Sequence, residues 1–312
     1  MNAHSPITSE LELSTSRVIE GDAFRLTHDL PDQSIDLVVS SPPYNIGKAY
    51  EKGMFASQEA YKEKLESLIE TLSAKLTSSG SICWQVGNHV KDGAVTPLDY
   101  VFFEIFSRHG FVLRNRIIWR FNFGLNAERR LSGRYETLLW FTKSNDYKFN
   151  LDSIRVPQIY PGKTKKTKAG VVPSGNPKGK NPSDFWEFDA EESFMGLPVW
   201  DFPNVKANHP EKTPHPCQFP NEVADRCILA FTSPGDVVLD PFAGMGTVAC
   251  CAEARGRVGV GFELDPEYAL QANERIALAA VGELVVRASG AAPRRPKPNE
   301  KVAQRPPEWA AG

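Results

Sequence analysis

The 312-residue chain is predicted to be an α/β protein with a largely parallel sheet, from three observations. Short apolar runs at 35–39, 237–239 and 258–262 have the length and the β-branched content of buried strands. The last two runs are spaced as in one strand–helix–strand unit. Each run is followed by polar or glycine-rich residues, which is typical of ligand-binding loops at the carboxyl ends of parallel strands.

The first run leads directly into Ser40-Ser41-Pro42-Pro43-Tyr44-Asn45. Proline has a fixed φ and no N–H, so this loop is stiff and its carbonyl groups are free to accept hydrogen bonds. The Ser41 hydroxyl adds an acceptor, and the Tyr44 ring adds a flat apolar face. Such a loop suits a planar base held by its exocyclic amine. A plain proline-rich turn after a strand is the alternative interpretation.

The second run ends at Asp240, and Gly244 and Gly246 precede an expected helix at 247–254. Glycines at this position let a ligand approach the backbone closely. The third run ends at Glu263, where a carboxylate can accept hydrogen bonds from ribose hydroxyls, as in dinucleotide-binding sheets. These residues predict a nucleotide-type cofactor site.

These stretches together resemble the DNA amino-methyltransferases that use S-adenosylmethionine, in the group whose catalytic motif precedes the cofactor motif. Asp240-Pro-Phe-Ala-Gly-Met-Gly-Thr247 is similar to the cofactor motif, Phe262-Glu263 to the second cofactor motif, and Ser41-Pro-Pro-Tyr44 to the catalytic motif. The run His215-Pro-Cys-Gln-Phe-Pro220 resembles the segment that covers the methionine part of the cofactor. The resemblance covers residues 17–145 and 195–280. It implies a Rossmann-like methyltransferase sheet with permuted motif order and an inserted, loop-rich target-recognition region.

The resemblance also implies roles for individual residues. The catalytic residues it implies are Ser41, Pro42, Pro43 and Tyr44. The residues it implies for S-adenosyl-L-methionine are Asp22, Pro220, Asp240, Phe242, Gly244, Gly246, Thr247 and Glu263. A short strand is predicted at 17–23 and ends in Gly21-Asp22, where an acid of the family lies near the adenine; a surface turn is the alternative.

Further elements are expected in order along the chain. They are helices at 57–76 (with Ser57 as N-cap), 100–108, 222–231 and 266–280, and strands at 81–86, 112–119 and 137–141. Residues 45–55 are expected to form a mobile loop over the site. The resulting division is a flexible arm (1–15), a catalytic half (16–145), a target-recognition insert (146–214), a cofactor-binding half (215–288) and a disordered tail (289–312).

Two stretches are predicted to contact DNA. Arg120, Arg129, Arg130 and Arg134 are interleaved with aromatic residues between two strands, which suits contact with a flipped base and its flanking phosphates. Residues 153–183 contain no acid but carry Lys163, Lys165, Lys166 and Lys168, which suits phosphate contact. Solvated arginine and lysine surfaces are the alternatives. An acidic stretch at 184–192 either turns away from DNA or pairs with these lysines.

Composition excludes several classes. The net charge is −2, so any positive field toward DNA must be local. The five cysteines form no C-x-x-C pair and suggest no metal site, which predicts a reduced, cytoplasmic chain. No cysteine stands in a P-C motif near the catalytic loop, which argues against the thiolate chemistry of cytosine-C5 methylation. Nothing approaches the ~20 apolar residues of a membrane span.

The leading hypothesis is therefore methyl transfer to the exocyclic N4 amine of cytosine in double-stranded DNA, with the base flipped and the methyl group passed directly in line. Within the family, Ser at the first motif position is more typical of N4-cytosine enzymes, and N6-adenine methylation is the runner-up. A DNA-binding protein without activity and a protein-amide methyltransferase are further alternatives. A homodimer and a cognate restriction endonuclease are considered as partners besides DNA.

Overall fold

A computed structural model of the chain describes residues 11–44, 57–121, 127–158, 160–186, 205 and 209–287. The predicted loop at 45–55, the predicted tail at 289–312 and residues 1–10 of the arm lie outside the described residues. The elements are β1 (Arg17–Glu20), α1 (Ala23–Leu26), β2 (Ile35–Ser40), α2 (Gln58–Lys75), β3 (Leu76–Val86), β4 (Asn88–Lys91), β5 (Ala94–Pro97), α3 (Leu98–Arg108), β6 (Val112–Arg120), β7 (Tyr135–Thr142), α4 (Leu151–Ile154), β8 (Thr164–Thr167), β9 (Gly170–Pro173), β10 (Phe185–Trp186), α5 (Asn221–Phe231), β11 (Val237–Asp240), α6 (Thr247–Ala254), β12 (Val258–Glu263) and α7 (Pro266–Ala280).

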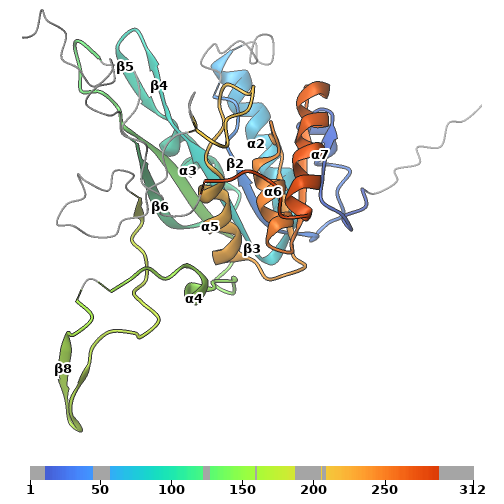
Figure 1. Ribbon diagram of the computed structural model, residues 1–312. Helices are drawn as coiled ribbons and strands as arrows, with labels where there is room; N and C mark the ends of the chain where they lie inside the picture. Colours follow the sequence, from blue (N-terminus) through green and yellow to red (C-terminus); the bar gives the residue numbers. More distant parts are fainter. Residues whose placement is uncertain are drawn as a thin grey trace, which may run out of the picture.

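A sheet of eight strands forms the centre of the molecule, in the order β1-β12-β11-β2-β3-β7-β6-β10 (Figure 1). Within this described sheet only β7 runs antiparallel to its neighbours, β3 and β6. Strands β2 and β11 pair in parallel, with Val38 opposite Leu239. Their carboxyl ends therefore lie side by side, although about 200 residues of chain separate them. This arrangement confirms the predicted α/β fold.

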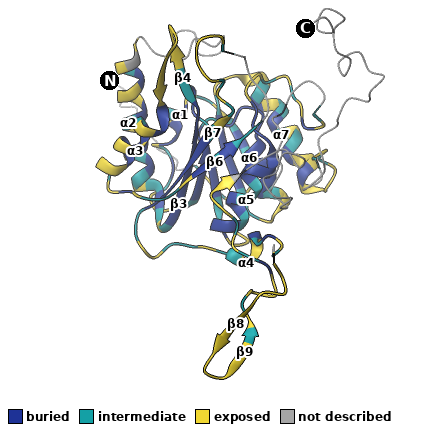
Figure 2. Cartoon of the chain, turned by 90° about the vertical axis from the view of Figure 1, so that its left-hand side faces the viewer, coloured by how far each residue is buried: buried dark blue, intermediate teal, exposed yellow. Residues whose placement is uncertain are grey.

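Both faces of the sheet are covered by helices (Figure 2), and β2 is buried along most of its length. Val38 belongs to the core formed with α1, α2 and α3, while Leu37 and Val39 belong to the core formed with α5 and α6. Successive strand residues point to opposite faces, so a strand covered on both faces carries apolar residues on both. The apolar residues Leu37, Val38 and Val39 have this cause, whereas Asp36 is half-buried and accepts hydrogen bonds from the Val237 N–H and from Lys148 Nζ.

Two predicted helices, α2 and α7, begin where the sequence signals indicate, whereas α3 begins at Leu98, before the expected residue 100. Ser57 is the N-cap of α2, and its Oγ accepts a hydrogen bond from the Ala60 N–H at 3.1 Å. Asp265 caps α7 by accepting from the N–H groups of Glu267 and Tyr268. Pro266 takes the first position of α7, where a missing N–H costs nothing.

The expected start of the third strand is wrong. It was expected at Ser81, but β3 begins at Leu76, directly after α2. Gly80 lies inside this strand, and a Cβ at that position would come within 2.7 Å of Leu76 Cγ. This need for glycine arises from the contact with Leu76, which the sequence pattern does not show.

The structure adds one regular feature within the loop-rich insert expected at 146–214. Residues Thr164–Thr167 and Gly170–Pro173 form a two-stranded hairpin, hereafter the lysine hairpin, that projects away from the sheet (Figures 1 and 2). Gly170 closes its turn with a φ of +117°. At its base, the chain segments that enter and leave the hairpin are joined by a bridge between Val156 and Lys180. The hairpin was missed because Thr-Lys-Lys-Thr has no apolar alternation.

Candidate functional site

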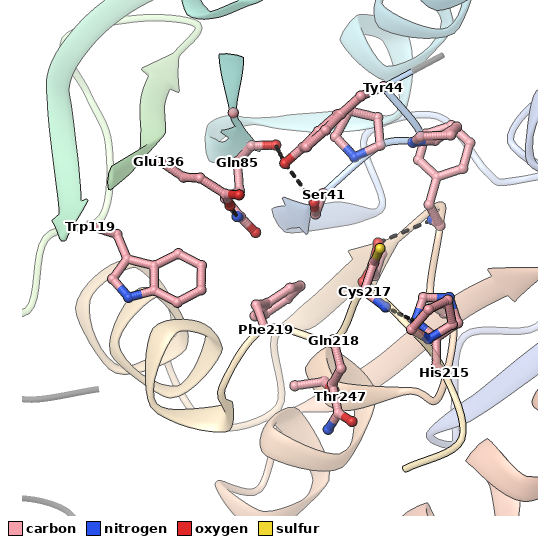
Figure 3. A pocket seen from close by; sticks show the side chains of 18 of the residues that line it. Ser41, Tyr44, Gln85, Trp119, Glu136, His215, Cys217, Gln218, Phe219 and Thr247 are labelled. Atoms are coloured by element: carbon pink, nitrogen blue, oxygen red, sulfur yellow. Dashed lines mark hydrogen bonds between the residues drawn. The ribbon is translucent and has the colours of Figure 1, made fainter. Parts of the chain in front are cut away.

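A cavity of about 1270 Å³ opens at the carboxyl ends of β2, β11 and β12. Both predicted motifs line it, Ser41 to Tyr44 on one side and the loop from Asp240 to Met245 on the other. Figure 3 shows Ser41 and Tyr44 facing a common space with Phe219 and Thr247. Because the ends of adjacent parallel strands share one edge of the sheet, the permuted motif order does not keep the two loops apart.

The cofactor loop depends on its glycines. Gly244 and Gly246 have φ values of +51° and +70°, in the left-handed region that other residues rarely adopt. A Cβ on Gly246 would also lie 2.9 Å from the Ala272 Cβ of α7. The loop therefore folds tightly against α7 and begins α6 at Thr247.

Three acids at the ends of β1 and β12 line the same wall of the cavity: Asp22, Glu263 and Asp265. Glu263 accepts from the Gly244 N–H at 2.8 Å and from the Asp265 N–H at 2.9 Å. Asp22 caps α1 by accepting from the Phe24 N–H at 2.9 Å. Burial raises the pKa of Glu263, and its backbone hydrogen bonds oppose that rise.

Asp240 is buried, with 2% of its surface exposed, and its carboxyl group stabilises the loop by hydrogen bonding. Its Oδ1 accepts from the Ser40 hydroxyl at 2.7 Å and from the Phe242 N–H at 3.0 Å. Burial raises the pKa of Asp240 to about 7, although both hydrogen bonds favour the charged form. The Ser40–Asp240 contact ties the strand of the catalytic loop to the strand of the cofactor loop.

The catalytic loop contains a short relay of hydroxyl groups. Ser41 Oγ and Tyr44 Oη lie 3.1 Å apart, and the Tyr44 hydroxyl donates a long hydrogen bond, 3.5 Å, to the Gln85 carbonyl oxygen. Either hydroxyl can donate in the Ser41–Tyr44 pair, and in both cases Ser41 Oγ keeps a lone pair for a donor in the cavity.

His215 lies against the cofactor loop, with its Nε2 3.5 Å from the position of a Cβ on Gly244. Burial, with Lys212 nearby, lowers the pKa of His215 to about 4. The Cys217 N–H donates to His215 Nδ1 at 3.3 Å, so the neutral ring carries its proton on Nε2. The ring therefore adds no positive charge to this wall at neutral pH.

Not all of the predicted site residues line the cavity. Pro220 and Gly246, the N-cap residues of α5 and α6, are not part of the lining. Arg120, Arg130 and Arg134 do line it, whereas Arg129 does not. The four lysines Lys163, Lys165, Lys166 and Lys168 are exposed on and beside the lysine hairpin, also outside the lining.

The cavity lining also includes Gln85, Trp119 and Glu136, to which the sequence alone assigned no individual role. Gln85 gives a signal in retrospect, because it is a polar residue inside the apolar run Ile-Cys-Trp-Gln-Val. Trp119 and Glu136 lie opposite each other where β6 pairs with β7. Their proximity depends on that long-range pairing, which single-residue patterns do not report.

Asp184, at the start of the acidic stretch, lies against β6. Its carbonyl accepts from the Ile118 N–H at 2.8 Å, and its carboxylate accepts from Asn115 Nδ2 at 3.2 Å. Residues 187–192 of that stretch lie outside the described residues. Among the residues that the structure describes, no three His, Cys, Asp or Glu side chains are grouped to hold a metal ion. None of the helices in this part has the length and apolar character that a membrane span requires.

Comparison with known proteins agrees with this architecture. The DNA methylase family model for N6 and N4 enzymes matches residues 35–274. The type II methyltransferase M.BglII of Bacillus subtilis is 46% identical over 256 residues, which cover 81% of this chain and 66% of that protein. The DNA adenine methyltransferase YhdJ of Escherichia coli (strain K12) is 31% identical over 265 residues, covering 84% of this chain and 83% of that protein.

A solved structure shares the fold. The DNA modification methylase TTHA0409 of Thermus thermophilus, crystallised in complex with S-adenosyl-L-methionine, superposes with a TM-score of 0.58 at 26% identity. The superposition covers 86% of this chain and 97% of that one. With both motifs meeting in one cavity and the family model matching residues 35–274, the chain belongs to the N6/N4 DNA methylase family, whose members depend on S-adenosyl-L-methionine.

Proposed function

We propose that this protein is a site-specific DNA methyltransferase that transfers the methyl group of S-adenosyl-L-methionine to the exocyclic N4 amine of a flipped cytosine in double-stranded DNA. The observation that carries the proposal is the single cavity lined by the Ser41–Tyr44 loop and the cofactor loop. Ser41 at the first motif position supports cytosine as the target base.

The residues of the cofactor wall fit this cofactor. Asp22 and Glu263 end adjacent strands, where their oxygens can accept from hydroxyl groups. Phe242 and Thr247 complete the lining on this side. His215 stays neutral, so it does not repel a cationic ligand. When bound, S-adenosyl-L-methionine supplies an electrophilic methyl group on a sulfonium.

The catalytic loop holds the amine. An exocyclic amine is a weak nucleophile because its lone pair is delocalised into the ring. The Ser41 Oγ lone pairs and the Pro42 carbonyl are acceptors for its two N–H groups, in a geometry fixed by the proline pair and by the Ser41–Tyr44 hydrogen bond. Orientation alone can contribute ~7–11 kcal/mol to such a transfer. Tyr44 is positioned to stack on the base.

The DNA backbone would be held beside the cavity. Arg120, Arg130 and Arg134 line it and can contact phosphates flanking the flipped nucleotide. Residues 146–214 are the proposed target-recognition region, and the lysine hairpin supplies further phosphate contacts. A cognate endonuclease as companion is supported by the type II name of M.BglII. We also propose that the protein forms a homodimer.

N6-adenine methylation is the second candidate. It is favoured by the 31% identity to YhdJ, which is named an adenine methyltransferase. The amine of adenine presents the same two N–H groups, so the same acceptors would serve.

The test is to incubate the protein with S-adenosyl-L-methionine and unmethylated DNA, digest the DNA to nucleosides and identify the product by mass spectrometry. N4-methylcytosine is expected. N6-methyladenine would transfer the mechanism to the second candidate, and no methylated nucleoside from varied DNA would overturn the proposed function.

A further inference from the structure

Gln85 is a buried polar residue with an unused oxygen. It lies one residue before the end of β3, with 4% of its surface exposed. Its Nε2 donates to Glu136 Oε2, while its Oε1 has no hydrogen-bond partner among the described residues. Buried polar atoms are nearly always paired, so an unpaired one at a cavity wall points to a missing ligand.

The position of Gln85 indicates what that ligand is. Gln85 and Glu136 come from neighbouring antiparallel strands and both line the cavity. In Figure 3 their side chains lie together beside Ser41, between Trp119 and Tyr44. The backbone carbonyl of Gln85 also ends the Ser41–Tyr44 relay. The amide therefore lies next to the atoms proposed to hold the amine.

We propose that Gln85 reads the edge of the flipped base beside its amine, with Glu136 as a positioning residue that sets the orientation of the Gln85 amide. This inference rests on the proposed function. Its Oε1 accepts from the amine N–H nearest the ring nitrogen, sharing it with Ser41 Oγ, and the second N–H of Nε2 donates to that ring nitrogen. Cytosine (N4 and N3) and adenine (N6 and N1) present this same donor–acceptor pair.

Glu136 gives the arrangement its direction. An ionised carboxylate only accepts, so it holds the NH2 end of the amide toward itself and leaves Oε1 as the acceptor toward the amine. Thymine and guanine present a keto oxygen and a ring N–H at these places. With these bases, the Gln85 Oε1 acceptor would face the keto oxygen, and the Nε2 donor would face the ring N–H. Gln85 thus selects amino bases over keto bases, whichever amino base is methylated.

The test is a thermodynamic cycle that combines one substitution in the protein with one change in the target base. The methylated site is first mapped with the wild-type enzyme on unmethylated DNA. Duplexes then carry the target base either intact or as its deaza analogue, 3-deazacytosine or 1-deazaadenine, which keeps the amine but lacks the ring nitrogen. Single-turnover methylation is measured for the wild type and for Gln85→Leu. The altered amine chemistry of the analogue affects both enzymes equally and cancels in the cycle.

For each enzyme, the rate on the intact base is divided by the rate on the analogue. This ratio is expected to be about 10-fold or more larger for the wild type than for Gln85→Leu. Gln85→Leu is expected to be about 10- to 100-fold slower on the intact base, with unchanged affinity for S-adenosyl-L-methionine. Equal sensitivity to the analogue in both enzymes would overturn the inference and leave the proposed function intact. No methylation by the wild type would overturn both.

Gln271→Leu is the matched control. Gln271 Nε2 donates to Glu267 Oε1 at 3.2 Å on the outer surface of α7, so it removes the same kind of pair outside the cavity. It is expected to behave as the wild type. If Gln85→Leu does not fold, Glu136→Gln replaces it as the test, because an amide at position 136 can donate or accept and no longer fixes the direction of the Gln85 amide.

In Glu136→Gln, the ratio of the rate on the intact base to the rate on the analogue should fall at least about threefold. An unchanged ratio would contradict the role of Glu136.

Discussion

On the cofactor wall of the cavity, acids accept hydrogen bonds from backbone N–H groups that lie close by in the chain. Asp22 caps α1, Asp265 caps α7, and Glu263 binds the Gly244 N–H across the loop. On the proposed base wall, formed by Ser41, Tyr44, Gln85 and Glu136, Gln85 hydrogen-bonds Glu136, 51 residues away, through the pairing of β3 with β7. The caps formed by Asp22 and Asp265 thus follow from local rules of helix starts, although the pairing of β1 with β12 brings Asp22 to the wall, whereas the Gln85–Glu136 contact depends wholly on strand pairing. Substitutions on the two walls should separate binding from turnover.

The largest effect is expected for Ser41→Ala. Losing one acceptor for the amine should slow methyl transfer about 10²- to 10³-fold. The affinity for S-adenosyl-L-methionine, measured by calorimetric titration, should stay near the wild-type value because Ser41 belongs to the base wall. Weaker cofactor binding in this variant would contradict the separation of the two walls.

Asp240→Asn should change the pH dependence of stability. Burial raises the pKa of Asp240 from 3.8 to about 7, so the native state holds a proton that the unfolded chain releases. That contribution to stability is fully present below pH ~4 and is lost as pH rises through 7. Between pH 5 and 8 the wild type should lose about 2–3 kcal/mol more than the variant in urea unfolding. Parallel pH profiles would show that the native carboxyl titrates normally.

Ser40→Ala should lower the free energy of unfolding by about 1–2 kcal/mol, because the buried Asp240 loses a donor. The neighbouring serines then differ sharply: Ser40 acts on stability and on the cofactor loop, and Ser41 on turnover. Chemical denaturation together with cofactor titration measures the difference. A Ser40→Ala enzyme with wild-type stability and cofactor affinity would show that the strand-to-strand bond is dispensable.

The smallest effects are expected on the arginines and lysines. Arg130→Gln and Arg134→Gln should each reduce the slope of log affinity for DNA against log salt by about one, and should also slow methylation. Gln at both Lys165 and Lys166 of the lysine hairpin should weaken DNA binding by a few fold without changing the rate on saturating DNA. Lys62→Gln, on the exposed side of α2, serves as control. A rate change from the hairpin variant would place it closer to the chemistry than the fold indicates.

Local signals predicted much of the fold. The helix starts at Ser57 and Pro266 and the strands at 237–240 and 258–263 follow from caps, glycines and apolar runs, and they bring Asp240 and Glu263 to one sheet edge. The β4–β5 hairpin and the lysine hairpin were not predicted, since neither has an apolar alternation. The pairing of Gln85 with Glu136 was also beyond prediction, because it depends on the register of two strands distant in sequence. Side chains that meet across a sheet are visible only once that register is known.

The parallel pairing of β1 with β12 has a consequence for how the molecule is made. Arg17 lies opposite Val260, and Asn273 of α7 hydrogen-bonds both the N–H and the carbonyl of Val18. In the described sheet β1 is an edge strand whose sole neighbour is β12. During synthesis, β1 emerges more than 200 residues before β12 and has no partner strand until β12 has been made. Asp22, which follows β1, therefore reaches the cofactor wall only when β12 and α7 are in place, so this wall joins the two ends of the described chain.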